Sequence, residues 1–288
     1  MTPGPDPRLA EVLEELYNCY NNRCWVHPDP LEFLYRYDRL PDREVAALVA
    51  SMLAYGRVGG ILDSVSRVLD PLGGAPARAL RHLYLEELEG MLEGFRHRFA
   101  TGFEVARILK AYSRLQSAEG GIGAYLGRIQ GSLMERLDTL VGRVYDLAGI
   151  PPVHLLAVPS RGSACKRHML MLRWMVRHDR VDPGGWQHLG RENLLVPLDV
   201  HMMRAARLIG LTESQSTCLR VAREITRGFG ALRPDDPVRY DFAITRFGIR
   251  PELTMDQLLP EIEARCARGP ACPPANAFDT GAGGASGS

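Results

Sequence analysis

Apolar side chains recur every three or four residues along most of the chain, which is the period of an α-helix with one buried face. No segment shows the strict alternation that is typical of a half-buried strand. The pattern and its flanking cap residues predict an all-α protein. The expected helices run at about 8–21, 42–55, 58–70, 76–88, 103–117, 121–147, 163–178, 200–210, 216–229, 236–248 and 255–267.

Short segments rich in glycine, proline and aspartate separate these helices, for example DPLGGAP at 70–76 and RPDDP at 233–237. The chain has 288 residues, of which 45% are hydrophobic, and can therefore bury a sizeable core. We expect a single bilobal domain over residues 1–272. The following segment, 273–288, consists mainly of small and polar residues and is expected to be disordered.

An aspartate interrupts the apolar run LLVPLDVHMM, and a buried carboxylate is costly without a partner. Pro197 disfavours helix just before Asp199, and helical spacing begins just after it. Asp199 therefore fits a helix N-cap, whose oxygen accepts the first free amide protons and contributes about 1 kcal/mol. A cap alone would explain the residue, but a cationic partner from elsewhere in the chain would explain it as well.

The basic residues are almost all arginine. Of 35 Lys and Arg residues only Lys110 and Lys166 are lysine, so 35 − 2 = 33 are arginine. Arginine stays protonated at any ordinary pH, whereas a deprotonated lysine amine is a nucleophile. A lysine in a chain that otherwise uses arginine is therefore a candidate nucleophile. Lys110, in FEVARILKAY, is expected to be a solvated surface residue. The net charge of +1 neither supports nor excludes a polyanionic partner.

Lys166 lies in PSRGSACKRHMLMLRWMVRHDR, which combines a turn with a basic helix. Ser163 is the expected N-cap of that helix, and a turn ending in Gly162 can point backbone amides at a phosphate. Lys166, Arg173 and Arg177 fall within about 40° of one another around the helix. This stripe fits either a phosphate-binding patch or the solvated edge of a core helix. If the two helix starts meet, Lys166 becomes the partner of Asp199.

Three stretches resemble the helix-hairpin-helix DNA glycosylase superfamily, which includes endonuclease III and the 8-oxoguanine glycosylases. LLAVPSRGSACKRHMLML (155–172) is similar to the hairpin and its lysine, and VPLDVHMMRAARLIGL (196–211) to the segment with the catalytic aspartate. DREVAALVASMLAYGRVGGILDSVSRVL (42–69) is similar to the helix pair that ends in DNA-wedging residues. The layout with the insert HDRVDPGGW also resembles an uncharacterised bacterial family of presumed glycosylase relatives.

Two departures from the superfamily pattern bear on these expectations. The turn reads PSRGS where the superfamily usually has Gly-Val-Gly, so only Gly162 remains. The interval from Lys166 to Asp199 is 199 − 166 = 33 residues, longer than in endonuclease III. The archaeal 8-oxoguanine glycosylases resemble this chain in having a similarly long interval, which favours an oxidised purine such as 8-oxoguanine as substrate.

The resemblance implies a bilobal helical fold with a helix-hairpin-helix motif and a bifunctional DNA glycosylase and AP lyase. Lys166 would be the nucleophile, and Asp199 would stabilise the cationic sugar. The expected DNA-binding residues are Ser160, Arg161, Gly162, Ser163, Arg173, Arg177, His201, Tyr55 and Arg57. The candidates for stacking on the base or reading its edge are Leu170, Trp174, Trp186 and Asp241. For His201 a buried structural role, and for Tyr55 ordinary core packing, remain open.

The expected partner is double-stranded DNA containing a damaged base, bound by a monomer without a cofactor or metal. Six cysteines form no CxxC pair with zinc-ligand spacing and are expected to be reduced thiols. No apolar stretch reaches the roughly 20 residues of a membrane helix, so the cytoplasm is the expected location. Two alternatives remain: a non-catalytic helix-hairpin-helix DNA-binding protein and a helical interaction module without nucleic acid.

Overall fold

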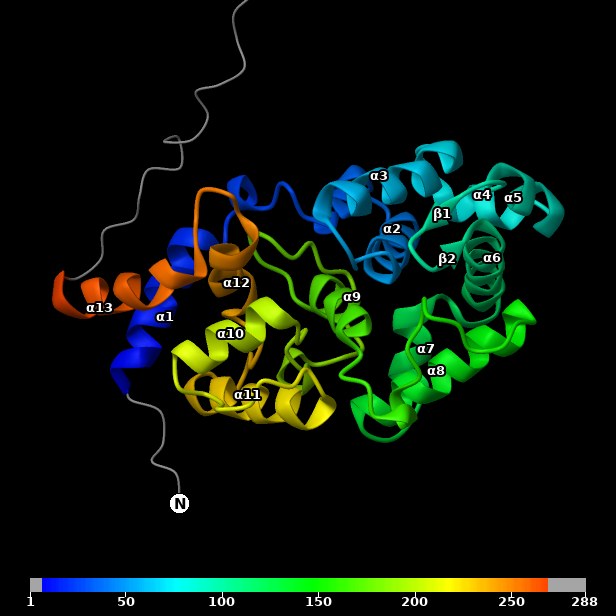
Figure 1. Ribbon diagram of the computed structural model, residues 1–288. Coiled ribbons are helices and arrows are strands. Elements are labelled where there is room, and N and C mark those ends of the chain that lie inside the picture. Colours follow the sequence, from blue (N-terminus) through cyan, green and yellow to red (C-terminus); the bar gives the residue numbers. More distant parts are fainter. Residues whose placement is uncertain (1–6, 269–288) are drawn as a thin grey trace, which may run out of the picture.

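The computed structural model describes residues 7–268, and in this part of the chain the fold is all-α apart from one short hairpin (Figure 1). The tail expected to be disordered, 273–288, lies outside the described residues. The helices are α1 (Pro7–Tyr20), α2 (Leu40–Met52), α3 (Val58–Leu69), α4 (Pro76–His82), α5 (Leu85–Met91), α6 (Gly102–Glu119), α7 (Ile122–Arg128), α8 (Leu133–Ala148), α9 (Lys166–Val176), α10 (Val200–Leu208), α11 (Leu219–Leu232), α12 (Asp241–Ile249) and α13 (Leu258–Arg268).

Two of the expected helices are each divided into two. The helix expected at 121–147 is interrupted before α8, where Gly131 has a φ of 110°. Ser132 then caps α8 by accepting from the amide of Glu135, whose carboxylate accepts from the amide of Ser132 at 2.7 Å. This reciprocal capping box starts a new helix. The helix expected at 76–88 is likewise divided into α4 and α5, because Tyr84 adopts an extended conformation.

A two-stranded antiparallel hairpin, which the apolar pattern did not predict, precedes α6. Its strands are β1 (Arg96–His97) and β2 (Ala100–Thr101), paired Arg96 with Thr101 and His97 with Ala100. Strands of two residues are too short to show an alternating pattern, so the sequence carries no period by which to recognise them. Thr101 also caps α6, and the hairpin therefore has a fixed position at the start of that helix.

Helix α9 occupies the middle of the molecule (Figure 1). It packs against α2, while α10 and α1 pack against α12, and α6 packs against α8. The apolar residues of α9 explain this position, because Met169, Leu172, Trp174 and Met175 are all buried. Burial of each such side chain contributes roughly 1.5–3 kcal/mol. Residues at the start of α9 can therefore contact segments from both sides of the molecule.

Candidate active site

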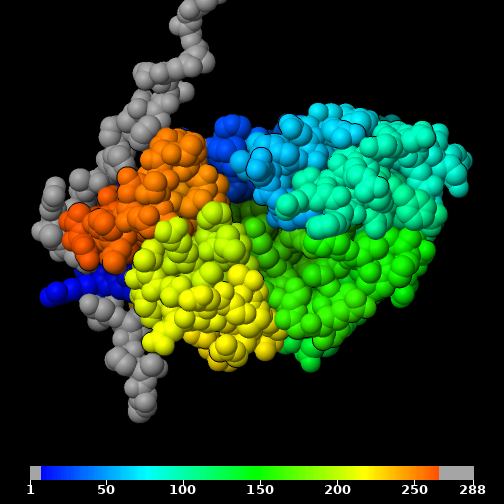
Figure 2. Space-filling view, viewed as in Figure 1, coloured from blue at the N-terminus to red at the C-terminus, as the bar shows by residue number. Residues whose placement is uncertain are grey.

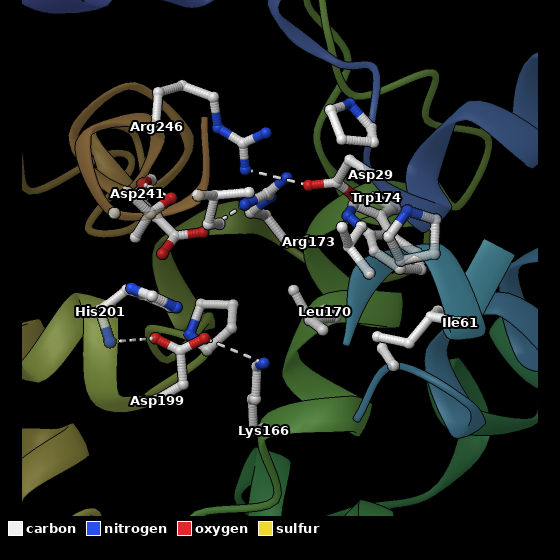
Figure 3. Close-up of a pocket in the computed structure, with 18 of the residues that line it drawn as sticks. Asp29, Ile61, Lys166, Leu170, Arg173, Trp174, Asp199, His201, Asp241 and Arg246 are labelled. Carbon is white, nitrogen blue, oxygen red and sulfur yellow. Dashed lines mark hydrogen bonds and ion pairs between the residues drawn. The ribbon is translucent and has the colours of Figure 1, made fainter. Parts of the chain in front are cut away.

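The starts of α9 and α10 meet, and the two residues singled out from the sequence contact each other. The Nζ atom of Lys166 lies 2.9 Å from Oδ2 of Asp199 (Figure 3). Both side chains remain partly accessible to solvent, at 33% for Lys166 and 20% for Asp199. The expected pairing is therefore confirmed, and Asp199 has the cationic partner that its position demanded.

The two carboxylate oxygens of Asp199 have separate tasks. Oδ1 accepts from the amides of His201 and Met202, at 3.0 and 2.9 Å, which confirms the predicted N-cap of α10. Oδ2 faces Lys166. Burial raises the pKa of Asp199, but Lys166 and the Met202 amide outweigh it and hold that pKa below its ordinary value. Asp199 therefore carries a stable negative charge beside the amine.

The expected cap of α9 was wrong. The helix begins at Lys166 rather than near Ser163, because Cys165 has a left-handed conformation with a φ of 50°. The Ser163 hydroxyl instead accepts from the Cys165 amide at 3.1 Å, within the turn. Lys166 is consequently the first residue of its helix, and its side chain starts from the same end of α9 that approaches α10.

The Lys166–Asp199 pair borders a cavity of about 270 Å³. The space-filling view shows this face hollowed between the yellow and orange segments on one side and the cyan and green segments on the other (Figure 2). Small-molecule sites in proteins usually begin at about 300 Å³, so the cavity suits one flat heterocycle better than a large cofactor. Leu170 and Ile61 supply apolar surface between the pair and the opposite wall (Figure 3).

The opposite wall of the cavity is a buried network of arginines and aspartates (Figure 3). Arg173 is paired with Asp241 and also with Asp182, at 3.2 Å, and Arg246 lies 2.9 Å from Asp29. Burial opposes the charge of Arg173, yet the neighbouring Asp182 and Asp241 raise its pKa above its usual value. The wall therefore offers fixed donors and acceptors to a polar ligand edge.

Arg173 and Arg177 do not form the predicted phosphate-binding stripe. Both are buried, at 3% and 2% exposure, so they cannot contact a duplex on the surface. The insert after α9 folds back and brings Asp182 within 2.7 Å of Arg177, while Asp236 approaches the same guanidinium at 3.1 Å. The prediction was wrong for both arginines, because aspartates from other segments of the chain form ion pairs with their buried guanidinium groups.

The turn before α9 does not present free amides to a phosphate. The amide of Ser160 donates to Oδ1 of Asp138 at 2.8 Å, and those of Arg161 and Gly162 donate to carbonyls of the turn at 3.2 and 3.0 Å. Ser163 forms an isolated bridge with Cys218. Gly162 has a φ of 80°, which explains the glycine. The backbone amides of residues 160–162 are therefore already occupied, which contradicts the predicted phosphate binding by them, while the side chains of Ser160 and Arg161 are exposed.

The structure separates the base-reading candidates into two groups. Leu170, Trp174 and Asp241 line the cavity, whereas Trp186 does not. The indole of Trp186 is buried and donates to Oε1 of Glu44 at 2.8 Å, so its assignment to the base was wrong.

Two charged residues of the cavity wall were not predicted from the sequence. They are Asp29 and Arg246, which come from opposite ends of the chain. The only signal for Asp29 is its place between two prolines, and the pattern of α12 gives none for Arg246.

Two substitutions distinguish Trp174, which lines the cavity, from Trp186, which donates to Glu44. We expect Trp186→Phe to lower the free energy of unfolding by about 1–3 kcal/mol, because Glu44 is buried and loses a hydrogen-bond donor. Trp174→Phe removes an indole N–H that has no partner among the described residues, and should cost less stability. Urea denaturation measures both. Equal losses of stability would contradict the assignment of Trp186 to the Glu44 site.

The remaining DNA-binding candidates differ in their surroundings. His201 lines the cavity and packs against Gly248, where a Cβ would lie 2.4 Å from its Nδ1 atom. Tyr55 is half-buried and donates to the carbonyl of His97 at 2.9 Å, which supports the packing interpretation. Arg57 is exposed at the start of α3.

Lys110 is not the solvated residue that its sequence position suggested. It is half-buried, and its ammonium donates to the carbonyls of Leu80 and Leu83 at the end of α4. Burial and the neighbouring Arg114 lower the pKa of Lys110. A lysine ammonium can donate to two such carbonyls at a helix C-terminus. Lys110 therefore has a structural role at the end of α4. Lys110 is not among the residues that line the cavity.

The described part of the chain, residues 7–268, holds no group of three or more His, Cys, Asp or Glu side chains arranged to bind a metal ion. Cys19, Cys24, Cys165 and Cys218 are free thiols. Within the same residues, no helix has the length and apolar character needed to cross a membrane.

Comparison with known proteins identifies one family. The model of the family described as "Protein of unknown function (DUF2400)" matches residues 29–250. This range includes Asp29, Lys166, Asp199 and Arg246, and therefore the ion pairs that border the cavity. Neither a curated protein nor a solved structure matches the chain significantly.

Proposed function

The chain belongs to the DUF2400 family, and we propose that it is a DNA glycosylase with AP lyase activity that excises a damaged base from double-stranded DNA. The observation that carries this proposal is the 2.9 Å contact between Lys166 and Asp199 at the edge of the cavity. An amine and a persistent carboxylate, side by side and partly accessible, suit nucleophilic attack at a carbon that becomes positively charged.

The proposed reaction begins with the neutral amine of Lys166. Its lone pair forms a bond to the sugar C1′ while the bond from C1′ to the base breaks, and the base leaves with that electron pair and takes up a proton. Opening of the C1′–O4′ bond, with a proton passing to O4′, produces an imine between Lys166 and the sugar. Loss of a proton from C2′ then allows the C3′–O bond to break, and the 3′ phosphate leaves with the electron pair.

Asp199 stabilises the positive charge that develops on the sugar as the base departs. Its lowered pKa keeps it ionised, and its attachment to the start of α10 fixes its position before the substrate arrives. The C1′ atom is unreachable inside a stacked duplex, so the damaged nucleotide must rotate outward to reach Lys166. The cavity is the space beside the pair into which the base then fits.

The wall of the cavity suits a base with several polar edges. Arg173, Asp241, Asp29 and Arg246 alternate positive and negative groups along it. Such a wall favours a purine that presents donors and acceptors together over an apolar base, because polar groups that stay unpaired are penalised. This agrees with the oxidised purine, such as 8-oxoguanine, that the sequence resemblance favoured.

A panel of duplexes, each with one damaged base, tests the proposal. We expect release of an oxidised purine, strand cleavage on the 3′ side of the lesion, and binding that weakens steeply as salt rises. The measurements are base release by chromatography, strand cleavage on a denaturing gel, and affinity at several salt concentrations. Absence of release from every duplex, with affinity that does not depend on salt, would overturn the proposal.

A further inference from the structure

We propose that Phe99, at the tip of the β1–β2 hairpin, enters the DNA base stack beside the extruded nucleotide and keeps the duplex open at that point. This inference rests on the proposed function, because it assumes that the protein acts on a nucleotide in duplex DNA. It assigns the opening of the base stack to the β1–β2 hairpin rather than to the helix pair at 42–69 that the sequence resemblance indicated.

Most of the Phe99 ring is exposed to solvent and could contact a partner. It is 73% exposed, the most exposed large apolar side chain among the described residues. The preceding residue, Arg98, has a φ of 52°, a left-handed conformation that is uncommon for a residue with a side chain. The hairpin thus holds a large apolar ring outward from the tip of a tight turn, which is the shape of side chains that insert between base steps.

The hairpin is firmly anchored to the rim of the cavity. The Tyr55 hydroxyl donates to the carbonyl of His97, and the His97 Nε2 atom lies 2.9 Å from the carbonyl of Tyr55. The other ring nitrogen of His97 lies 2.8 Å from the Ser64 hydroxyl of α3. Gly56, which lines the cavity, packs under the side chain of Arg98. Tyr55 is therefore held as an anchor, whereas the ring of Phe99 stays largely exposed.

A chain of contacts connects Phe99 with the start of α9. Its ring meets His154 edge-on, with centroids 5.6 Å apart, and His154 meets Tyr55 at 4.5 Å. Arg167, the neighbour of Lys166, lies over the Tyr55 ring at 5.0 Å and donates to the carbonyl of Met52 at 3.1 Å. A side chain that inserts at Phe99 would therefore keep a constant position relative to the amine.

The charge around the tip favours DNA as the occupant. Arg57, Arg96 and Arg98 are exposed on the rim and the hairpin, and the segment FRHRFATGF at 95–103 contains no acidic residue. Cations around an exposed aromatic ring match a partner that presents phosphates on its outside and stacked bases inside.

The test uses a duplex with a central tetrahydrofuran abasic analogue and 2-aminopurine as its neighbour. This base fluoresces more strongly when it is unstacked, and the duplex contains no base to release at the analogue. We expect the wild-type protein to raise the fluorescence and Phe99→Ala to reduce that rise to about one tenth, because unstacking costs a few kcal/mol per step. Phe99→Leu should retain most of the rise, because it keeps an apolar side chain.

Tyr84→Ala is the matched control. Tyr84 is 72% exposed, nearly as much as Phe99, but lies outside the cavity and the hairpin. It should behave like the wild type. An undiminished rise with Phe99→Ala, an equal loss with Tyr84→Ala, or no rise with the wild type would each overturn the inference.

Base release separates this inference from the proposed function. A rise that depends on Phe99, without release of any base, supports the inference and refutes the glycosylase. Release from duplex DNA that is unchanged in Phe99→Ala supports the glycosylase and refutes the inference. If both are correct, Phe99→Ala slows release from duplex DNA about tenfold and leaves release from a single strand nearly unchanged, because a single strand needs no opening.

Discussion

Replacement of Lys166 by arginine is expected to abolish the covalent trapping of damaged DNA and to lower base release by at least about 10³-fold. Borohydride reduces an imine to a stable amine, so wild-type protein should become attached to the damaged strand. A guanidinium stays protonated and cannot form that imine. It can still pair with Asp199, 2.9 Å from the present amine, so the folded structure should survive. Gel electrophoresis measures trapping, and mass spectrometry locates the adduct.

Lys110→Arg is the control for the trapping experiment. Lys110 is the other lysine of the chain. Its ammonium donates to the carbonyls of Leu80 and Leu83, and it does not line the cavity. Trapping should persist in this variant. An adduct at the terminal amine, or base release without trapping, would refute the assignment of Lys166 and indicate an enzyme that uses water. Salt-dependent DNA binding without release in the wild type would support the non-catalytic DNA-binding alternative.

Replacement of Asp199 by asparagine is expected to lower base release by about 10²–10³-fold with little loss of stability. Asparagine caps a helix about as well as aspartate and can keep the bonds to the amides of His201 and Met202. It cannot supply negative charge to the developing cation. Removal of the partly exposed pair with Lys166 should cost no more than about 1 kcal/mol. Single-turnover base release and thermal denaturation measure the two effects.

The pH dependence of stability provides a second readout for Asp199. Because its pKa is lower in the folded than in the unfolded protein, its ionisation stabilises the fold above the unfolded pKa of about 3.9. This contribution disappears as the pH falls through the folded pKa. The wild type should therefore exceed Asp199→Asn in stability by a constant amount at neutral pH and lose that advantage below about pH 4. An unchanged release rate with a lowered thermal midpoint would leave Asp199 as a cap alone.

Much of the local structure was predictable, because it depends on residues close together in the sequence. The period of apolar residues predicted an all-α fold, and the structure confirms this. The N-cap role of Asp199 was predicted from the proline before it and the helical spacing after it. The capping box of Ser132 and Glu135 was equally visible in the sequence, and with it the division between α7 and α8 could have been predicted.

The candidate site was predictable only in part. Lys166 was singled out by composition and Asp199 by its place in an apolar run, and their predicted contact is confirmed. The hypothesis of a cationic stripe failed because it considered one helix alone. Asp182 lies in the insert and Asp236 beyond α11, so no helical period relates them to Arg177.

The sequence by itself determined which segments form helices and where several of them begin. It also singled out Lys166 and Asp199 as an expected pair. Helix formation and capping depend on interactions within a few residues, so their signals are present in short stretches of the chain. The tertiary structure alone decided which charges face the cavity. Arg173 became part of a cavity wall and Arg177 part of a buried network, while the ring of Phe99 remained exposed at the rim. These outcomes depend on burial and on carboxylates brought together by packing, because the charge that a side chain presents is set by its neighbours in space.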